Sequence, residues 1–212
     1  MLLSLPTPRG TGIAISGEVV DLKNLLSTVQ HIKSSVDRES HPHYIILNTF
    51  ESEIENAQNG NRIISGKIKG FRYFWTDIIL VIAILRYRAG YMETNATHQS
   101  SLRELEQCTL QAMHQLDPVT TSKLSSLVQQ GMDVNDPYLL QVMENVNVLH
   151  LMNPAGKNRF KKVYGFFEEY FNRYSEVHAE FVAHLKKTAK QLKCEPTDLR
   201  AEDLELPEEG EW

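Results

Sequence analysis

The sequence predicts a mainly α protein with a minor antiparallel β-sheet (α+β), and three observations support this fold class. Short β-branched and aromatic stretches, separated by glycines, lie in the first 75 residues. After Gly90, apolar residues recur at helical spacing. Residues 157–193 then carry an unbroken apolar stripe over about ten helical turns. We expect a small N-terminal three-stranded sheet and a helical bundle with one long C-terminal helix.

Residues 1–92 are expected to form a unit of strands and helices that contains the small sheet. Glycines bracket the first strand, and Asp21 stands where the N-cap of a helix belongs. The expected elements are a strand at 12–17, helices at 21–36 and 47–57, a hairpin or two edge strands at 62–74, and a helix from 78. The strand and the hairpin together make the sheet, and the apolar helix covers it.

Residues 93–194 are expected to form the helical bundle, packed on the first unit as a single globule. Asp117-Pro118 and Asn135-Asp136-Pro137 are helix start signals, because Asp or Asn caps a helix and Pro fits its first turn. No Pro or Gly follows Gly165 before residue 193, so we expect one continuous helix at 157–193.

The acidity of the chain is concentrated at its end. The formal net charge is −5, yet residues 195–212 alone hold eight acidic residues and one arginine. We expect this segment to be a disordered acidic tail, because it has few apolar residues and much charge. Its last residue, Trp212, fits a docking motif, and the alternative is that a Trp at this position is accidental. The rest of the chain is near neutral, which excludes a strongly basic nucleic-acid-binding protein.

Cysteine use and hydropathy indicate the compartment. Cys108 and Cys194 lie far apart and outside metal-type spacing, so we expect free thiols in a reducing cytoplasm. The longest apolar run, residues 78–85, is far shorter than the roughly 20 residues that span a bilayer. The N-terminus has neither the basic residues nor the apolar run of a signal peptide. We therefore expect a cytoplasmic protein without a membrane partner.

The apolar stripe of the long helix predicts an interface. A helix of about 55 Å is longer than the core of a domain of this size, so part of the stripe must face another helix or another chain. Its residues keep a coiled-coil-like 3/4 spacing. They are Phe160, Val163, Phe167, Tyr170, Tyr174, Val177 and Phe181. The leading hypothesis is a non-enzymatic protein–protein interaction or regulatory protein that self-associates, or binds a helical partner, through this seam.

A competing hypothesis is an enzyme. Arg173 and His178 fit Arg-x4-His, the pattern carried by helical ribonucleases of the HEPN type. On this hypothesis the protein is a HEPN-like dimeric ribonuclease and the toxin of a defence module. In such a site, His removes the 2′-OH proton of RNA and Arg stabilises the phosphate. Against it, five residues turn a helix by about 140°, so the two side chains do not share a face. The same pattern also occurs between Arg38 and His43, in an expected loop.

A basic cluster opens the long helix, where the helix dipole disfavours cations. It consists of Lys157, Arg159, Lys161 and Lys162. Its possible partners are RNA, an acidic protein and the acidic tail of the chain itself, and the alternative is a solvated basic turn. The Glu-x-x-His spacing of di-metal bundle sites is absent, as is any Gly-rich phosphate loop. We expect no metal, cofactor or small-molecule ligand.

The first ninety residues carry a resemblance to a known family. Ile15-Ser16-Gly17-Glu18 and Asp21-Leu22-Lys23-Asn24-Leu25 match a strand, turn and helix pattern, and Phe71 to Arg86 is similar to a later aromatic-to-aliphatic helix. The chain thereby resembles small, uncharacterised bacterial proteins grouped as a domain of unknown function. Glu18 stands where that family has Asp, and its Arg-His pair is absent. The resemblance implies the strand–helix order and a bacterial or phage context, and it supplies no reaction. A third hypothesis stands beside the other two: an antitoxin or regulator of a neighbour-encoded protein, in a defence or toxin–antitoxin system.

Overall fold

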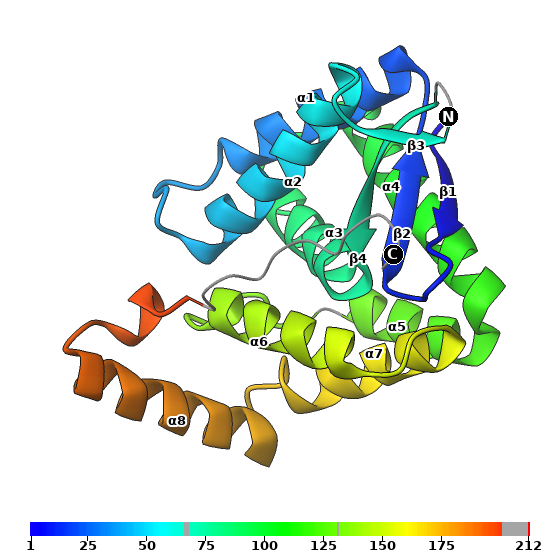
Figure 1. Cartoon of the computed structure of the whole chain (residues 1–212). Coiled ribbons are helices and arrows are strands. Elements are labelled where there is room, and N and C mark those ends of the chain that lie inside the picture. The colour runs from blue at the N-terminus through cyan, green and yellow to red at the C-terminus, as the bar shows by residue number, and fades with distance from the viewer. Residues whose placement is uncertain (66–67, 131, 201–211) are drawn as a thin grey trace.

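A computed structural model describes residues 1–65, 68–130, 132–200 and 212, and these residues form a mainly helical α+β fold, as predicted (Figure 1). In chain order the elements are β1 (Leu3–Pro6), β2 (Gly12–Ser16), α1 (Val19–Lys33), α2 (Pro42–Gln58), β3 (Ile63–Ser65), β4 (Ile68–Phe74), α3 (Trp75–Ala89), α4 (Ala96–Leu116), α5 (Pro118–Gln130), α6 (Leu139–Met152), α7 (Lys157–Glu169), α8 (Glu176–Leu192) and a 3₁₀ turn at Pro196–Asp198.

The sheet is antiparallel, with strand order β1-β2-β4-β3. The three predicted strands are β2, β3 and β4, and β1 is an additional edge strand that pairs Leu3 with Ser16. The sequence signal for β1 is weak because the strand has four residues and ends in Pro6, which is tolerated at a sheet edge. Helix α4 packs along β1, and α2 packs along β4.

One hydrophobic core joins the two predicted units. Helix α3 follows β4 directly and lies at the centre of the molecule, where every residue from Ile78 to Leu85 is buried (Figure 1). The same core includes Phe50 of α2, Leu105 of α4 and Phe160 of α7. None of the described helices has both the length and the hydropathy that a bilayer span requires.

The prediction of one continuous helix at 157–193 is wrong. Helix α7 ends at Glu169, and α8 begins at Glu176. Two side chains between them bond to nearby backbone amides: Asn172 Oδ1 accepts from Tyr174 N at 3.1 Å, and Ser175 Oγ accepts from His178 N at 3.0 Å. Such local bonds compete with the helical ladder, and Ser175 thereby becomes the N-cap of a new helix.

The start of the predicted disordered tail is packed on α6. Gln141 Nε2 donates to the carbonyl oxygens of Thr197 and Leu199, at 2.8 and 3.1 Å, and Arg200 Nε donates to Glu144 Oε1 at 2.6 Å. Residues 201–211 lie outside the described part of the chain. Trp212 is buried, with its ring 5.3 Å from that of Phe74 between centroids.

Candidate interaction site at the start of α8

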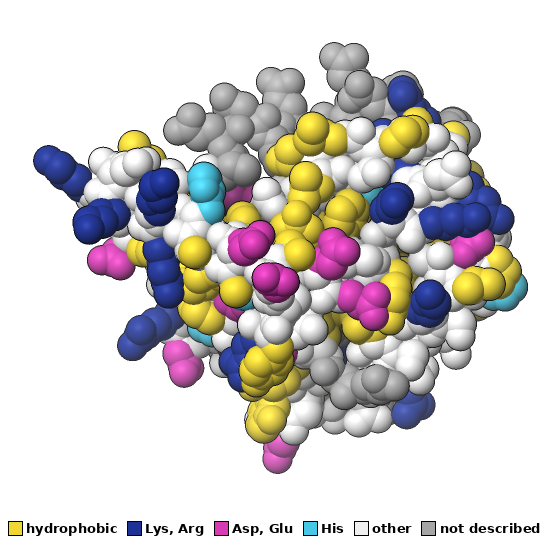
Figure 2. Space-filling model, turned by 90° about the horizontal axis from the view of Figure 1, so that it is seen from below, with side chains coloured by type: hydrophobic (Ala, Val, Ile, Leu, Met, Phe, Trp, Pro, Cys, Tyr) yellow, Lys and Arg dark blue, Asp and Glu magenta, His cyan; other side chains and the backbone are white. Residues whose placement is uncertain are grey.

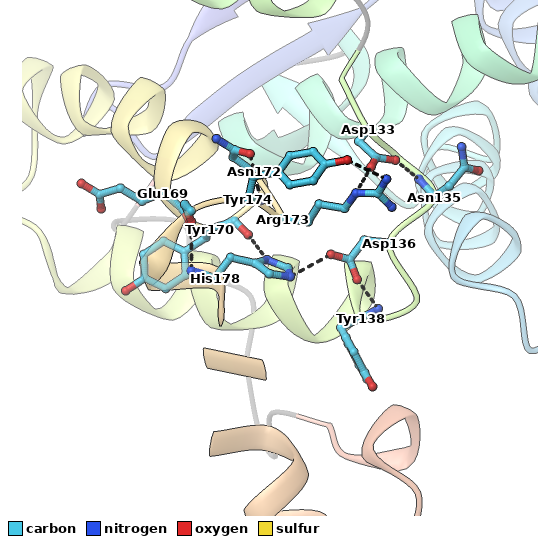
Figure 3. A network of polar contacts seen from close by, with 11 residues as sticks. Asp133, Asn135, Asp136, Tyr138, Glu169, Tyr170, Asn172, Arg173, Tyr174 and His178 are labelled. Atoms are coloured by element: carbon cyan, nitrogen blue, oxygen red, sulfur yellow. Dashed lines mark hydrogen bonds and ion pairs between the residues drawn. The ribbon is translucent and has the colours of Figure 1, made fainter. Parts of the chain in front are cut away.

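The turn between α7 and α8 lies against the loop that precedes α6 (Figure 3). A groove runs along their junction. Its volume is about 430 Å³. Pro137, Ala179, Val182 and Ala183 give it an apolar lining, and two cations, Arg173 and Lys186, also border it. Asp136, Tyr138 and His178 complete the lining, so the groove combines apolar side chains with charged and polar ones.

The loop before α6 contributes two aspartates whose positions are set by local hydrogen bonds. Asp133 Oδ1 accepts from Asn135 N at 3.1 Å, and Asp136 Oδ1 accepts from Tyr138 N at 2.7 Å. These are the short side-chain-to-backbone bonds that Asp makes in turns and at helix starts. Each carboxylate therefore has its second oxygen directed to the segment between α7 and α8.

His178 is held on both sides of its ring. Its Nδ1 lies 2.7 Å from the carbonyl oxygen of Tyr170, and its Nε2 lies 3.0 Å from Asp136 Oδ2. The His178 and Asp136 side chains are only 7% exposed each. Because a carbonyl oxygen only accepts, Nδ1 must carry a proton. The contact between Nε2 and Asp136 Oδ2 uses a proton of either His178 or Asp136. Both ring nitrogens therefore face groups of this chain.

Arg173 makes the second link between the two segments. Its Nε lies 3.0 Å from Asp133 Oδ2, and its Nη2 donates to the Tyr174 hydroxyl at 3.0 Å. The hydrogen bond to Tyr174, followed by the charge of Asp133, raises the pKa of Arg173. The Tyr174 side chain itself is 82% exposed. The outer rim of the site is therefore an exposed aromatic ring beside a permanent cation.

The structure brings Arg173 and His178 to one groove, which the helical spacing argued against. The break before α8 removes the constraint of a single helix, so both side chains reach the loop before α6. Sequence reasoning missed their partners, Asp133 and Asp136. It identified Asn135-Asp136-Pro137 as a helix start, but the ion pair with His178 depends on tertiary packing, which leaves no local sequence signal.

The seven residues of the predicted seam do not form one stripe. Phe160, Val163 and Phe167 are buried in the core of the single chain, and Phe160 lies against Trp75 with ring centroids 5.1 Å apart. Tyr170, Val177 and Phe181 are half-buried, and Tyr174 is exposed. The α7 half of the seam is thus core packing, and only its second half borders an open surface.

The predicted basic cluster is also divided. Arg159 is buried and donates to Thr11 Oγ1 at 2.7 Å and to the Leu151 carbonyl at 3.1 Å, so it ties α7 to the start of β2. Lys157 and Lys161 lie 3.7 and 3.9 Å from Asp117 Oδ1. Lys162 is exposed. The four residues do not present one basic surface.

Two other polar clusters have structural roles. His41 caps α2 by accepting from His43 N at 3.1 Å, and burial lowers the pKa of His43 to about 4. Asp77 accepts from Asn147 Nδ2 at 2.7 Å, which joins α3 to α6, and burial raises the pKa of Asp77 to about 7. Within the described ranges, His, Cys, Asp and Glu do not gather in threes as a metal ion would require.

Helix α8 is loosely integrated into the fold. Of its 17 residues, only His178, Leu185 and Ala189 are buried. It lies at the lower edge of the molecule in Figure 1. Figure 2 shows Lys and Arg side chains gathered at the left, the side on which Figure 1 places the C-terminal part of α8. Most of this helix surface therefore has no partner within the described chain.

The comparisons with known proteins give a family but no activity. Neither the curated proteins nor the solved structures contain a significant match to the chain. The sequence model of one family, described as a domain of unknown function (DUF6904), matches residues 2–212. The chain, with its four-stranded sheet, central α3 and exposed α8, therefore belongs to the DUF6904 family.

Proposed function

We propose that the protein is a non-enzymatic protein–protein interaction or regulatory protein that binds a helical partner, in particular a second copy of itself, through α8 and the adjacent groove. The observation that carries this proposal is the small buried fraction of α8, which buries three of its 17 residues. A helix of this length is marginal in water on its own, and packing of its apolar face normally stabilises it.

The groove supplies the apolar part of such an interface. Ala179, Val182 and Ala183 come from successive turns of α8, and Tyr138 lies beside them with Lys186 Nζ 5.7 Å from its ring centroid. Exposed Tyr174 adds an aromatic ring at the rim, a residue type enriched at protein interfaces. Small residues on the floor and rings at the edge favour a helix that lies in the groove.

The polar groups at the site support binding more than catalysis. The His178 nitrogens face Tyr170 and Asp136, and Arg173 faces Asp133. These bonds hold α8 against the loop before α6. We place the protein in the cytoplasm of a bacterium, a proposal supported by the two free thiols and by the sequence resemblance. A neighbour-encoded protein in a defence or toxin–antitoxin system is the hetero-partner to test there.

Light scattering coupled to size-exclusion chromatography tests the proposal. We expect the molar mass of the wild type to rise with protein concentration, and Ala179→Arg to weaken this rise, because the long side chain fills the groove. Ala96→Arg is the matched control, since Ala96 is exposed on α4, away from the groove. Two results together overturn the proposal. The wild type keeps a constant monomer mass, and it captures no partner that Ala179→Arg fails to capture.

One observation favours a ribonuclease as the second candidate: Arg173 and His178 border the same groove. In this proposal a conformational change frees the His178 ring from Asp136, and the ring then acts as the general base on RNA. Expression of the wild type and His178→Ala in cells, followed by RNA integrity and growth measurements, tests it. Equal RNA integrity and equal growth reject the ribonuclease.

A further inference from the structure

We propose that α8 pairs with α8 of a second copy of the chain, antiparallel and across a two-fold axis. This inference rests on the proposed function and specifies its contact. The relevant surface is a stripe on the exposed side of α8 that borders the groove at Ala183, and we call it the charge stripe. Its members are exposed and recur at intervals of four and three residues: Glu176, Glu180, Ala183, Lys187 and Lys190.

Within the described part of the chain, the charges of the stripe have no ion-pair partner, and they are separated by sign. Both glutamates lie in the N-terminal half of α8 and both lysines in its C-terminal half. None of the four forms an ion pair with any residue that the structure describes. A second α8 laid in the reverse direction therefore presents lysines to the glutamates of the first and glutamates to its lysines.

The middle of the stripe permits close contact. Ala183 lies between the acidic and the basic pairs, and its methyl group allows two helices to approach closely, since interaxial distance depends on the side chains at the contact. With the two-fold axis near Ala183, Glu176 and Glu180 of one copy face Lys187 and Lys190 of the other. The surface is then self-complementary, as the interface of a symmetric dimer must be.

The helix dipole favours the same distribution of charge, because acids suit the N-terminus of a helix and cations its C-terminus. The dipole effect falls off within the first and last turns, however, so it gives no reason for Glu180 and Lys187 to carry these charges. Glu176 and Glu180 are four residues apart and Lys187 and Lys190 are three apart, and such pairs of like-charged neighbours destabilise an isolated helix. Opposite charges from a second copy relieve both repulsions. An experiment that exchanges charges between copies separates the two explanations.

The expected dimer is weak and sensitive to salt. Helix α8 has 17 residues and is about 25 Å long, so two such helices bury less surface than a standard interface. Exposed ion pairs set the orientation and are screened by salt. We therefore expect the dimer fraction to rise with protein concentration and to fall at high ionic strength.

Reciprocal charge reversal is the test. One variant carries Glu176→Lys with Glu180→Lys, and the other carries Lys187→Glu with Lys190→Glu. Each variant alone places like charges against like charges, so we expect each to be a monomer by light scattering. Mixed in equal amounts, they are expected to form a heterodimer. A variant with Lys23→Glu and Lys162→Glu, two exposed lysines outside α8, is the control for net charge and is expected to dimerise as the wild type does.

Circular dichroism of each variant measures whether α8 stays folded. A heterodimer that forms only on mixing supports the pairing, because neither the dipole nor the stability of α8 in one chain depends on mixing. A wild type that dimerises while both reversed variants also dimerise overturns the antiparallel pair but leaves self-association through another surface. A wild type that stays monomeric overturns the pair and self-association together.

Discussion

Helices α7 and α8 are neighbours in sequence with similar spacing of apolar residues, yet they occupy different environments. Helix α7 inserts Phe160, Val163 and Phe167 into the core, and α8 buries a histidine, a leucine and an alanine at the edge of the molecule. The difference arises in the turn between them, where side-chain hydrogen bonds replace the helical ladder. An apolar stripe at 3/4 spacing therefore does not by itself separate a core helix from an interface helix.

The largest expected difference between the two helices is in core packing. Phe160 is fully buried on α7, so Phe160→Ala is expected to lower the free energy of unfolding by about 3–5 kcal/mol. Phe181 on α8 is half-buried, and Phe181→Ala is expected to cost about 1 kcal/mol. Urea denaturation followed by circular dichroism measures both. Equal losses would show that α8 is as much a part of the core as α7.

The free energy of unfolding is expected to depend on pH through Asp77, which lies on the core helix α3. Burial raises its pKa to about 7, so between pH 4 and 7 the folded state holds a proton that the unfolded state has released. The free energy of unfolding therefore falls as pH rises through this window. Asp77→Asn keeps the acceptor of the Asn147 bond without the charge, and is expected to be more stable than the wild type at pH 8 by up to about 3 kcal/mol.

Thermal unfolding of both proteins at pH 4.5 and pH 8 measures the effect of Asp77. The stability difference between them is expected to shrink at the lower pH. Glu55→Gln, which removes an exposed carboxylate on α2, is the control and is expected to follow the wild type at both values. Parallel pH profiles for the wild type and Asp77→Asn would show that Asp77 is ionised in the folded state throughout.

The fold was largely predictable from sequence because apolar periodicity and turn residues report local structure. They located α1, α2, α3, strands β2 to β4 and the starts of α5 and α6, and the run 78–85 was correctly predicted to be a buried helix. The break at 170–175 was not predicted, since it contains neither Gly nor Pro. The candidate site could not be predicted because the Asp136–His178 and Asp133–Arg173 pairs join segments that are distant in sequence.

The next largest expected loss of stability comes from breaking the contact between α8 and the loop before α6. His178→Gln removes the partner of a buried carboxylate, and we expect it to lower the free energy of unfolding by about 2 kcal/mol. The added substitution Asp136→Asn should recover part of this loss, because no charge is then left unpaired. A double-mutant cycle measured by urea denaturation gives the coupling. Strictly additive losses would show that the pair contributes no coupling.

The smallest effect concerns the break itself. Ser175→Ala removes the N-cap of α8 and is expected to cost about 1 kcal/mol, whereas Ser175→Asp should preserve the cap. The measurement is again urea denaturation, with Ser122→Ala on exposed α5 as the control. If both alanine variants match the wild type, the cap is not what starts α8.

The most direct test of the central claim is amide hydrogen exchange of α7 and α8 as a function of protein concentration. The claim is that α7 belongs to the core of one chain and that a second copy completes the packing of α8. We predict slow exchange in α7 at every concentration, and fast exchange in α8 of the dilute protein that slows as the concentration rises. Equally slow exchange in both helices of the dilute protein would contradict the account.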